Sequence, residues 1–177
     1  MRSNKMKTLP LKTPLGLMTA VADDFALYRL SFTDDSDLSL ELERLEKCMQ
    51  AKITEGETPI LNLVHNELSE YFEGKLKIFS VPLAPYGTTF QRRTWMALTK
   101  VPYGATQSYA DIATVLNQPT AFRAVANANG SNPIAVIVPC HRIIKSSGDL
   151  CGYRSGIDRK RWLLDLEKRT LSLEHPR

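Results

Sequence analysis

The sequence predicts a mixed α/β (α+β) fold of two domains, and three observations lead to this prediction. Two β-prone runs followed by two amphipathic stretches fill the first half of the chain. Residues 80–89, SVPLAPYGTT, are rich in Pro, Gly and Thr and are typical of a linker. Beyond them the pattern changes to short helices. We therefore expect a small sheet-plus-helix domain at residues 1–84 and a mostly helical domain at residues 85–177.

The first domain begins with a predicted β-hairpin. Residues 15–21 and 25–32 are β-prone, and Ala22, Asp23 and Asp24 between them are typical of a tight connection. Two helices should follow. Residues 37–50 place leucines at helical spacing, namely Leu38, Leu42 and Leu45. Thr58 and Pro59 form a helix start, and Gly74 is a plausible C-terminal cap for the second helix.

The second domain should begin with a helix over residues 88–101. Ser108 and Asp111 then resemble a capping box that starts a helix over residues 108–116. A turn at residues 117–119 follows, and we expect Thr120 to cap a helix over residues 121–130. Two short helices joined by about four residues favour a helix-turn-helix, although a plain helical hairpin in a core gives the same pattern.

The chain should end in a helix over residues 157–169. Trp162, Leu163 and Leu166 form one apolar stripe along it, with Glu167 at the edge of that stripe. We expect an aliphatic strand at residues 134–138, IAVIV, just before this region. Pro139 would end that strand and turn Cys140 toward a pocket.

Charge is distributed unevenly between the two predicted domains. The net charge of +4 divides into −3 for residues 1–84 and +7 for residues 85–177. A basic domain joined to an acidic one is typical of a polyanion-binding domain with a supporting domain. Surface variation without function remains an alternative explanation of the same numbers.

Composition excludes several classes of protein. No apolar run approaches the roughly twenty residues of a membrane span, and Pro10, Lys12 and Pro14 interrupt any signal-peptide core. Three irregularly spaced cysteines do not form a disulfide framework. We expect a cytoplasmic protein with reduced thiols and no membrane partner.

The predicted second helix of the helix-turn-helix is poor in side chains that identify bases. AFRAVANANG contains mostly small residues, with Arg123 and two asparagines. Sequence-specific readers need Arg, Lys, Asn or Gln side chains that reach base edges. This composition favours a protein that approaches any sequence closely and intrudes at one point, where Arg123 would fill a vacated place in the base stack.

Cys140 and His141 form the one clear nucleophile–base combination. As neighbours in an extended segment they would point to opposite faces, so a direct bond is awkward and a bridging water is the better geometry. Glu167 could hold the other ring nitrogen and stabilise an imidazolium. The pattern argues against a zinc site, because the chain has no CxxC and its other histidines are distant in sequence. A buried inert thiol is the alternative for an isolated cysteine, and we expect that role for Cys48 and Cys151.

Several motifs in the second domain are similar to those of one family. FQRRTW, VPYGATQSYADIA, FRAVANANGSNP, PCHRII, GY and WLL-x-x-E occur in order over residues 90–167. In this set the chain resembles the O6-alkylguanine-DNA alkyltransferases, the methylated-DNA–protein-cysteine methyltransferases. The first domain matches more loosely. The resemblance implies a ribonuclease H-like first domain and a winged helix-turn-helix-like second domain that enters the minor groove.

The resemblance also implies residue roles. Cys140 would accept the alkyl group, His141 and Glu167 would activate it, Asn132 would hinge the recognition helix to the cysteine segment, and Tyr109 would donate to the extruded base. Arg123 would intercalate. The remaining DNA-binding candidates are Thr120, Ala121, Ala124, Ala126, Asn127 and Tyr109. The implied substrate pocket comprises Val138, Pro139, Tyr153, Arg154, Ser155 and Gly156.

The implied partner is double-stranded DNA carrying O6-alkylguanine, with O4-alkylthymine as a further candidate, and the implied state is a monomer without a cofactor. Two departures from the family pattern matter. Ser155 stands where many relatives have glycine, so the pocket could be narrower. No cysteines or histidines near the N-terminus match the zinc site of some relatives, so we expect no metal.

Displacement of guanine by a thiolate yields a thioether, which offers no carbonyl for water to attack. The sequence therefore predicts a protein that acts once. Two other functions stay open at this point. A helix-turn-helix regulator with a redox- or alkylation-sensing Cys140 would prefer one DNA sequence, and a cysteine hydrolase would turn over.

Overall fold

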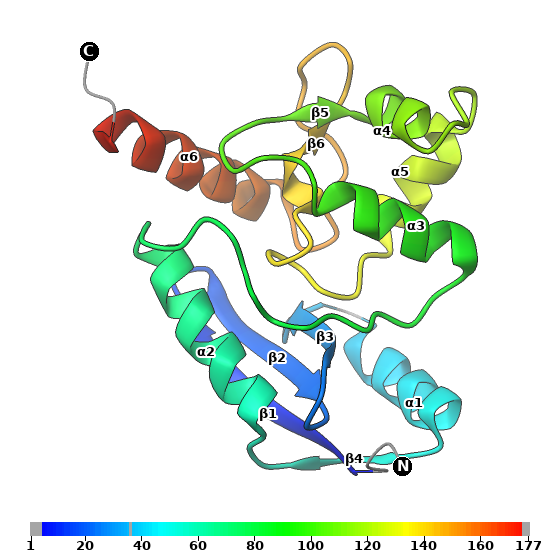
Figure 1. Ribbon diagram of the computed structural model, residues 1–177, viewed down its shortest axis with the longest axis vertical. Coiled ribbons are helices and arrows are strands. Elements are labelled where there is room, and N and C mark those ends of the chain that lie inside the picture. The colour runs from blue at the N-terminus through cyan, green and yellow to red at the C-terminus, as the bar shows by residue number, and fades with distance from the viewer. Residues whose placement is uncertain (1–4, 36, 175–177) are drawn as a thin grey trace. The chain divides into compact units, whose positions relative to one another are not determined.

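The computed structural model describes residues 5–35 and 37–174. The chain divides into two compact units, Met1–Tyr86 (unit 1) and Gly87–Arg177 (unit 2) (Figure 1). Unit 1 combines a sheet with helices and unit 2 is mostly helical, which confirms the α+β prediction. None of the helices in the described ranges combines the length and the apolar character that crossing a bilayer requires.

Unit 1 contains a four-stranded sheet in the order β3-β2-β1-β4. Its strands are β1 (Lys5–Thr13), β2 (Gly16–Ala22), β3 (Leu27–Phe32) and β4 (Lys52–Glu55). β2 pairs antiparallel with both β1 and β3, and β4 pairs parallel with β1. The hairpin of β2 and β3 confirms the prediction, and the Asp23 carboxylate stabilises its turn by accepting from two backbone N–H groups.

Strands β1 and β4 had no counterpart in the sequence prediction. Pro10 and the lysines of β1 obscure its alternation, although Met6 and Leu11 are buried. β4 pairs only with Lys5–Thr8, so Pro10 lies where β1 has a neighbour on one side alone. A proline is tolerated at such an edge because its missing N–H removes no bond on the open side.

The two helices of unit 1 are α1 (Leu38–Met49) and α2 (Pro59–Phe72). In α1, Leu38 and Leu45 are buried, and Leu45 packs in a core cluster with residues of β1, β2 and β3. In α2 the Thr58 hydroxyl accepts from the Leu61 N–H at 3.1 Å. Gly74 follows the helix in the left-handed region, with φ 74°. Both helices and their caps near Thr58 and Gly74 were predicted.

Unit 2 surrounds a short cysteine segment with helices. Its elements are α3 (Thr89–Leu98), β5 (Gln107–Ser108), α4 (Tyr109–Val115), α5 (Phe122–Gly130), the 3-10 helix η1 (Cys140–Arg142), β6 (Ile143–Ile144) and α6 (Ile157–Glu174). The Trp95 indole donates to the Ala128 carbonyl at 2.8 Å and ties α3 to α5. β5 pairs parallel with β6, which brings the start of α4 beside the chain that follows the cysteine.

The predicted strand at residues 134–138 is wrong. These residues are buried but form turns, with Val138 N–H donating to Ile134 O at 3.0 Å and Ile137 N–H to Ala135 O at 2.8 Å. Val136 adopts φ 71°, a conformation that valine rarely takes. A short continuous apolar run cannot be assigned to a strand by periodicity alone, and here residues 135–137 form turns while Ile134 takes part in an isolated bridge and not in a strand.

The predicted Thr120 cap is also wrong. Helix α5 is preceded by Ala121, which makes no side-chain capping bond. Ala121 N–H donates to Gln118 O at 2.8 Å, so a backbone turn leads into the helix. The chain between α4 and α5 covers residues 116–121. The final helix is five residues longer than predicted, since α6 continues to Glu174 instead of ending at 169.

Candidate functional site

Cys140 begins the short helix η1 and is buried. The side-chain amide of Asn132 donates to the Cys140 Sγ at 3.0 Å, to Val138 O at 2.9 Å and to Ile134 O at 3.3 Å. Its carbonyl oxygen accepts from the Ile134 N–H at 3.0 Å. Asn132 thus joins the end of α5 to the cysteine segment and supplies a hydrogen bond to the sulfur.

Burial raises the pKa of the Cys140 thiol above its ordinary value. The Asn132 hydrogen bond and the positive charge of Lys160 act in the opposite direction, because both favour the thiolate. The resting group is therefore a thiol, and an attack by sulfur requires a base.

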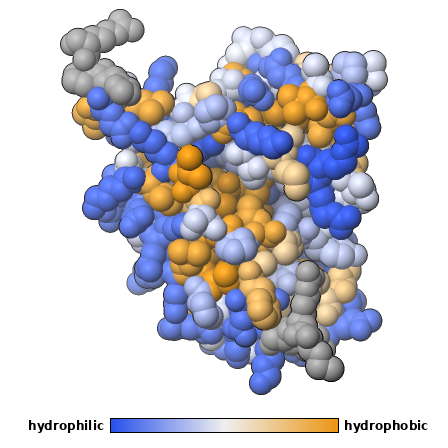
Figure 2. All heavy atoms as spheres, viewed as in Figure 1, coloured by the Kyte–Doolittle hydropathy of each residue, from blue (hydrophilic) through white to orange (hydrophobic). Residues whose placement is uncertain are grey.

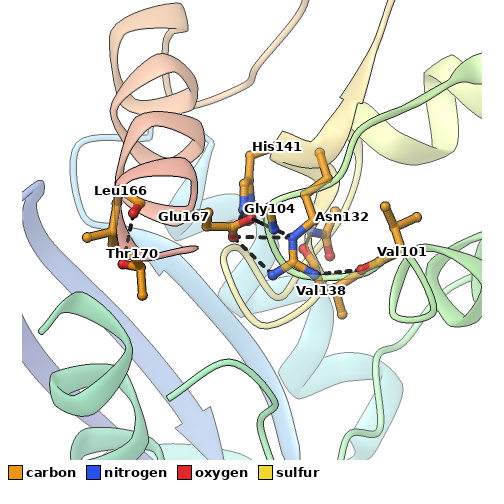
Figure 3. Close-up of polar contacts among 9 residues, drawn as sticks. Val101, Gly104, Asn132, Val138, His141, Leu166, Glu167 and Thr170 are labelled. Carbon is orange, nitrogen blue, oxygen red and sulfur yellow. Dashed lines mark hydrogen bonds and ion pairs between the residues drawn. The ribbon is translucent and has the colours of Figure 1, made fainter. Parts of the chain in front are cut away.

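His141 is fully buried and lies on the same helical turn. Its Nε2 lies 2.8 Å from Glu167 Oε1 (Figure 3). Because a carboxylate can only accept, Nε2 carries the hydrogen and Nδ1 is left as the basic atom. Nδ1 is buried and has no hydrogen-bond partner among the described residues. Burial lowers the pKa of His141 despite the bond to Glu167, so the imidazole is neutral and able to take a proton.

Glu167 is the centre of a buried network (Figure 3). The Arg142 guanidinium donates to Oε2 from Nε and to Oε1 from Nη2, both at 3.0 Å, and from Nη1 to Val101 O at 2.7 Å. Gly104 N–H donates to Oε2 at 2.9 Å. Burial alone would raise the pKa of Glu167, but the bonds from His141 and Arg142 outweigh it and lower that pKa to about 2. Glu167 therefore stays ionised and orients the imidazole.

Tyr109 is the first residue of α4, directly after the Ser108 cap. Ser108 and Asp111 form the predicted capping box, with Asp111 N–H donating to Ser108 Oγ at 3.1 Å and Ser108 N–H to the Asp111 carboxylate at 2.8 Å. The Tyr109 hydroxyl is 3.7 Å from Cys151 Sγ. Burial, and then this contact, raise the pKa of Tyr109 above its ordinary value, so the phenol keeps its proton.

Lys160 is a site residue that the sequence prediction missed. It is fully buried on α6, and its ammonium donates to Ile143 O and, at 3.0 Å, to Cys151 O. Burial lowers its pKa, while the nearby thiols Cys151 and Cys140 act to raise it. Its spacing from Leu163 and Glu167, three and seven residues ahead on one helical face, was the signal available in the sequence.

Asn129 and Arg142 were also missed. Asn129 is buried on α5, and its amide donates to the Cys140 carbonyl at 3.4 Å. Arg142 lies on η1 with its charge held between Glu167 and the Val101 carbonyl. A polar residue on the inward face of a helix of small residues was the signal for Asn129. Nothing local to the sequence pairs Arg142 with Glu167.

Apart from Tyr109 at the start of α4, the predicted DNA-binding residues lie on and just before α5. Val125, Ala128 and Asn129 form its buried face. Arg123, Ala124, Asn127 and the preceding Thr120 are exposed, while Ala121 and Ala126 are half-buried. Small side chains thus cover most of the outer face.

The predicted pocket residues come from two segments. Val138 and Pro139 are buried beside the cysteine. In the loop before α6, Tyr153 and Ser155 are half-buried, whereas Arg154 and Gly156 are exposed. The Ser155 carbonyl accepts from Arg159 Nη1 at 3.1 Å, which ties the loop to α6. Cys151, expected to be structural, lies in this loop beside Tyr109. Within residues 5–35 and 37–174, no group of three or more His, Cys, Asp or Glu side chains is placed to hold a metal ion.

Both units match known protein families. Residues 89–169 match the 6-O-methylguanine DNA methyltransferase DNA-binding domain, and residues 6–85 match the ribonuclease-like domain of the same family. A crystal structure of Mycobacterium tuberculosis OGT in complex with DNA has 39% sequence identity and a TM-score of 0.80, over 94% of each chain.

Curated relatives agree with these matches. A methylated-DNA–protein-cysteine methyltransferase of Methanosarcina mazei is 54% identical over 108 residues, which cover 61% of this chain and 68% of that protein. With the inducible Bacillus subtilis protein of the same name the match spans 59% of that protein. The Mycolicibacterium paratuberculosis protein of that name is 42% identical over 157 residues, which cover 89% of each chain. The chain therefore belongs to the 6-O-methylguanine DNA methyltransferase family.

Proposed function

We propose that this protein repairs O6-alkylguanine in duplex DNA by transferring the alkyl group to its own Cys140. The observation that carries the proposal is the hydrogen bond of 2.8 Å between His141 Nε2 and Glu167. His141 lies on the same turn, η1, as the buried Cys140 thiol. It leaves Nδ1 as a base next to a nucleophile whose own pKa is raised. This arrangement suits a sulfur that is ionised only when a substrate is in place.

The reaction is an in-line substitution at the alkyl carbon. The Cys140 proton passes to His141, through a bridging water, and the sulfur forms a bond to carbon as the carbon–O6 bond breaks. The electron pair of that bond stays on the guanine, which takes up one proton from solvent, and the His141 imidazolium then returns to solvent the proton that it took from Cys140. Glu167 stabilises the transient imidazolium, because its pKa of about 2 keeps it anionic throughout.

Tyr109 and Lys160 stabilise the two negative charges of this step, on the guanine leaving group and on the Cys140 thiolate. The Tyr109 phenol keeps its proton and donates to the guanine as negative charge develops on the leaving group. The ammonium of Lys160 favours the thiolate of Cys140 electrostatically. Asn132 donates to the same sulfur and fixes its direction.

The product is a thioether, and no group on this site can hydrolyse a carbon–sulfur bond. Each molecule therefore acts once and needs no cofactor. A regulator that senses oxidation at Cys140 is not favoured by the comparisons, because the relatives carry the names of methyltransferases.

DNA binding belongs to unit 2 in this proposal, and unit 1 supports it. The net charge of +7 over residues 85–177 would attract phosphates. The outer face of α5 lies in the minor groove, where small side chains allow close approach and Arg123 fills the place of the extruded guanine. The proposed site draws all of its residues from one chain, so a monomer suffices, and we expect it to act in the cytoplasm, where thiols stay reduced.

Intact-mass measurement after incubation with a duplex containing O6-methylguanine tests the proposal. We expect the protein to gain one methylene, located on Cys140 by peptide mapping, with one methyl group transferred per molecule. Repeated turnover would contradict the single use of Cys140 and favour a hydrolase.

Two cysteine variants serve as matched controls. Cys140→Ala should gain no mass, whereas Cys151→Ser removes the other thiol of the site and should still gain one methylene. An equal gain in Cys140→Ala would exclude Cys140 as the acceptor.

A further inference from the structure

Two bulky side chains interrupt the otherwise small outer face of α5, and both lie at its first turn. Arg123 is one of them, and the other is Phe122, whose surface is 46% exposed. Phe122 opens the helix, and the Arg123 guanidinium carbon lies 5.9 Å from the centre of its ring. Figure 2 shows apolar surface next to hydrophilic surface over the α4–α5 part of unit 2.

The exposure of Phe122 is not explained by packing within unit 2. Helix α5 packs on unit 2 through the buried side chains of Val125 and Ala128. The hydrogen bond from the Trp95 indole to the Ala128 carbonyl also anchors the helix to α3. A phenyl ring left half in water gains little for the folded state. It gains more when a partner covers it.

The partner that best suits this exposed ring is duplex DNA in which one base has been extruded and its neighbours are partly unstacked. Proteins of the minor groove insert apolar side chains, phenylalanine among them, between base steps and so unstack them. A base has an aromatic face whatever its sequence, so an aromatic side chain can stack on any of the four. The adjoining Arg123 stacks on the same ring, which holds both groups at one point of the helix.

We propose that Phe122 is a second DNA-contacting residue that wedges into the base step beside the extruded nucleotide. Arg123 fills the vacated place, and the Phe122 ring stacks on the neighbouring base. This inference rests on the proposed extrusion of O6-alkylguanine, and it adds a residue that acts through apolar stacking and not through charge.

The test compares Phe122→Ala, Phe122→Leu and Arg123→Ala with the unchanged protein on a duplex containing O6-methylguanine next to 2-aminopurine. The 2-aminopurine fluorescence rises when its base is unstacked. Phe122→Ala should lose that rise and bind the duplex about 5- to 150-fold more weakly, the range for removal of one aromatic–base stack. Phe122→Leu keeps an apolar wedge and should lose less.

Two further measurements distinguish a wedge from other roles. The logarithmic salt dependence of the dissociation constant should be unchanged in Phe122→Ala, because no positive charge is lost. Arg123→Ala removes one charge that displaces counterions from the DNA and should reduce the slope by about one. The rate of methyl transfer from free O6-methylguanine base should be unaltered in Phe122→Ala. Phe25→Ala, a change at a phenylalanine with 61% of its surface exposed in unit 1, is the matched control and should change nothing.

Each result supports or overturns the inference. Duplex binding and fluorescence equal to those of the unchanged protein in Phe122→Ala would remove the wedge. Equal losses on duplex and free base, or a reduced salt slope, would assign Phe122 to site integrity or to the arginine instead. Failure of the unchanged protein to transfer methyl groups to Cys140 would refute the proposed function itself, which separates the two failures.

Discussion

Burial affects the protonation of Cys140 and His141 in opposite directions, because it raises the pKa of the thiol and lowers the pKa of the imidazole. Burial holds the Cys140 thiol in its protonated form and the imidazole in its neutral form, since it disfavours charge on both. The same burial strengthens the ionic network of Glu167 and Arg142, which replaces lost water with fixed hydrogen bonds. The Cys140 thiol and the His141 imidazole therefore both stay uncharged before substrate binds.

Removal of the base should change both the rate and its pH dependence. We expect His141→Ala to transfer methyl groups about 100- to 10,000-fold more slowly near neutral pH, the usual contribution of a positioned base. Because hydroxide can then ionise the thiol directly, the deficit should shrink as pH rises. Single-turnover rates on an O6-methylguanine duplex across neutral and alkaline pH measure this. A deficit of constant size at every pH would contradict the role of His141 as the proton acceptor.

Glu167→Gln should destabilise the fold as well as slow the reaction. The change leaves the Arg142 charge buried without a carboxylate, and breaking a buried ion pair in this way costs about 3–5 kcal/mol. Urea unfolding at neutral pH, followed by circular dichroism, gives the difference. Asp158→Asn, which removes a carboxylate from an exposed ion pair on the same helix, is the control and should cost less than about 1 kcal/mol.

The pH dependence of that difference has a definite sign. The folded pKa of Glu167 is about 2, below its ordinary 4.5, so its stabilisation is complete above about 4.5 and is lost as pH falls toward 2. The gap in unfolding free energy between wild type and Glu167→Gln should therefore narrow in acid. A gap independent of pH would show that the carboxylate charge is not what stabilises the network.

The sequence predicted helix α5 but not the turns that follow it. The helix-turn-helix and the capping box at Ser108 follow from local patterns, and both are present. The apolar residues 134–138 were expected to form a strand because periodicity cannot separate a buried strand from buried turns. Asn132 satisfies three backbone groups and the sulfur of that segment. Such a distribution of bonds is invisible in the linear sequence.

Asn132→Ala should release the cysteine segment. Loss of the amide leaves the buried Ile134 N–H without its acceptor, at about 1–3 kcal/mol for a buried group left unsatisfied. The Ile134 and Val138 carbonyls each lose one donor but keep a backbone N–H partner. We expect a lower urea midpoint together with slower methyl transfer to Cys140. Asn127→Ala, at an exposed asparagine of the neighbouring helix, is the control for stability and should leave the midpoint nearly unchanged.

The uneven charge of the whole chain makes a prediction about salt. Residues 85–177 carry +7 and residues 1–84 carry −3, so phosphate contacts should dominate affinity for undamaged duplex. Added salt should weaken duplex binding with a logarithmic slope of about −0.9 for each phosphate contact. The rate with free O6-methylguanine base should hardly change. Fluorescence anisotropy and single-turnover rates measure the two, and equal salt effects on both would contradict the electrostatic account.

The mixed fold, the turns at Asp23 and Gly74, and the nucleophile with its neighbouring base followed from local sequence, because capping, turn chemistry and residue type act over a few positions. Lys160, Arg142 and Asn129 did not, and neither did the strands β1 and β4. Their roles depend on partners far along the chain: Glu167 meets Arg142 only after α6 packs on η1, and β4 meets β1 only after α1 has intervened. The proposal that Cys140 is the reactive thiol thus rests on local sequence. The environment that controls its proton is set by long-range packing, which alone brings buried charges within hydrogen-bonding distance.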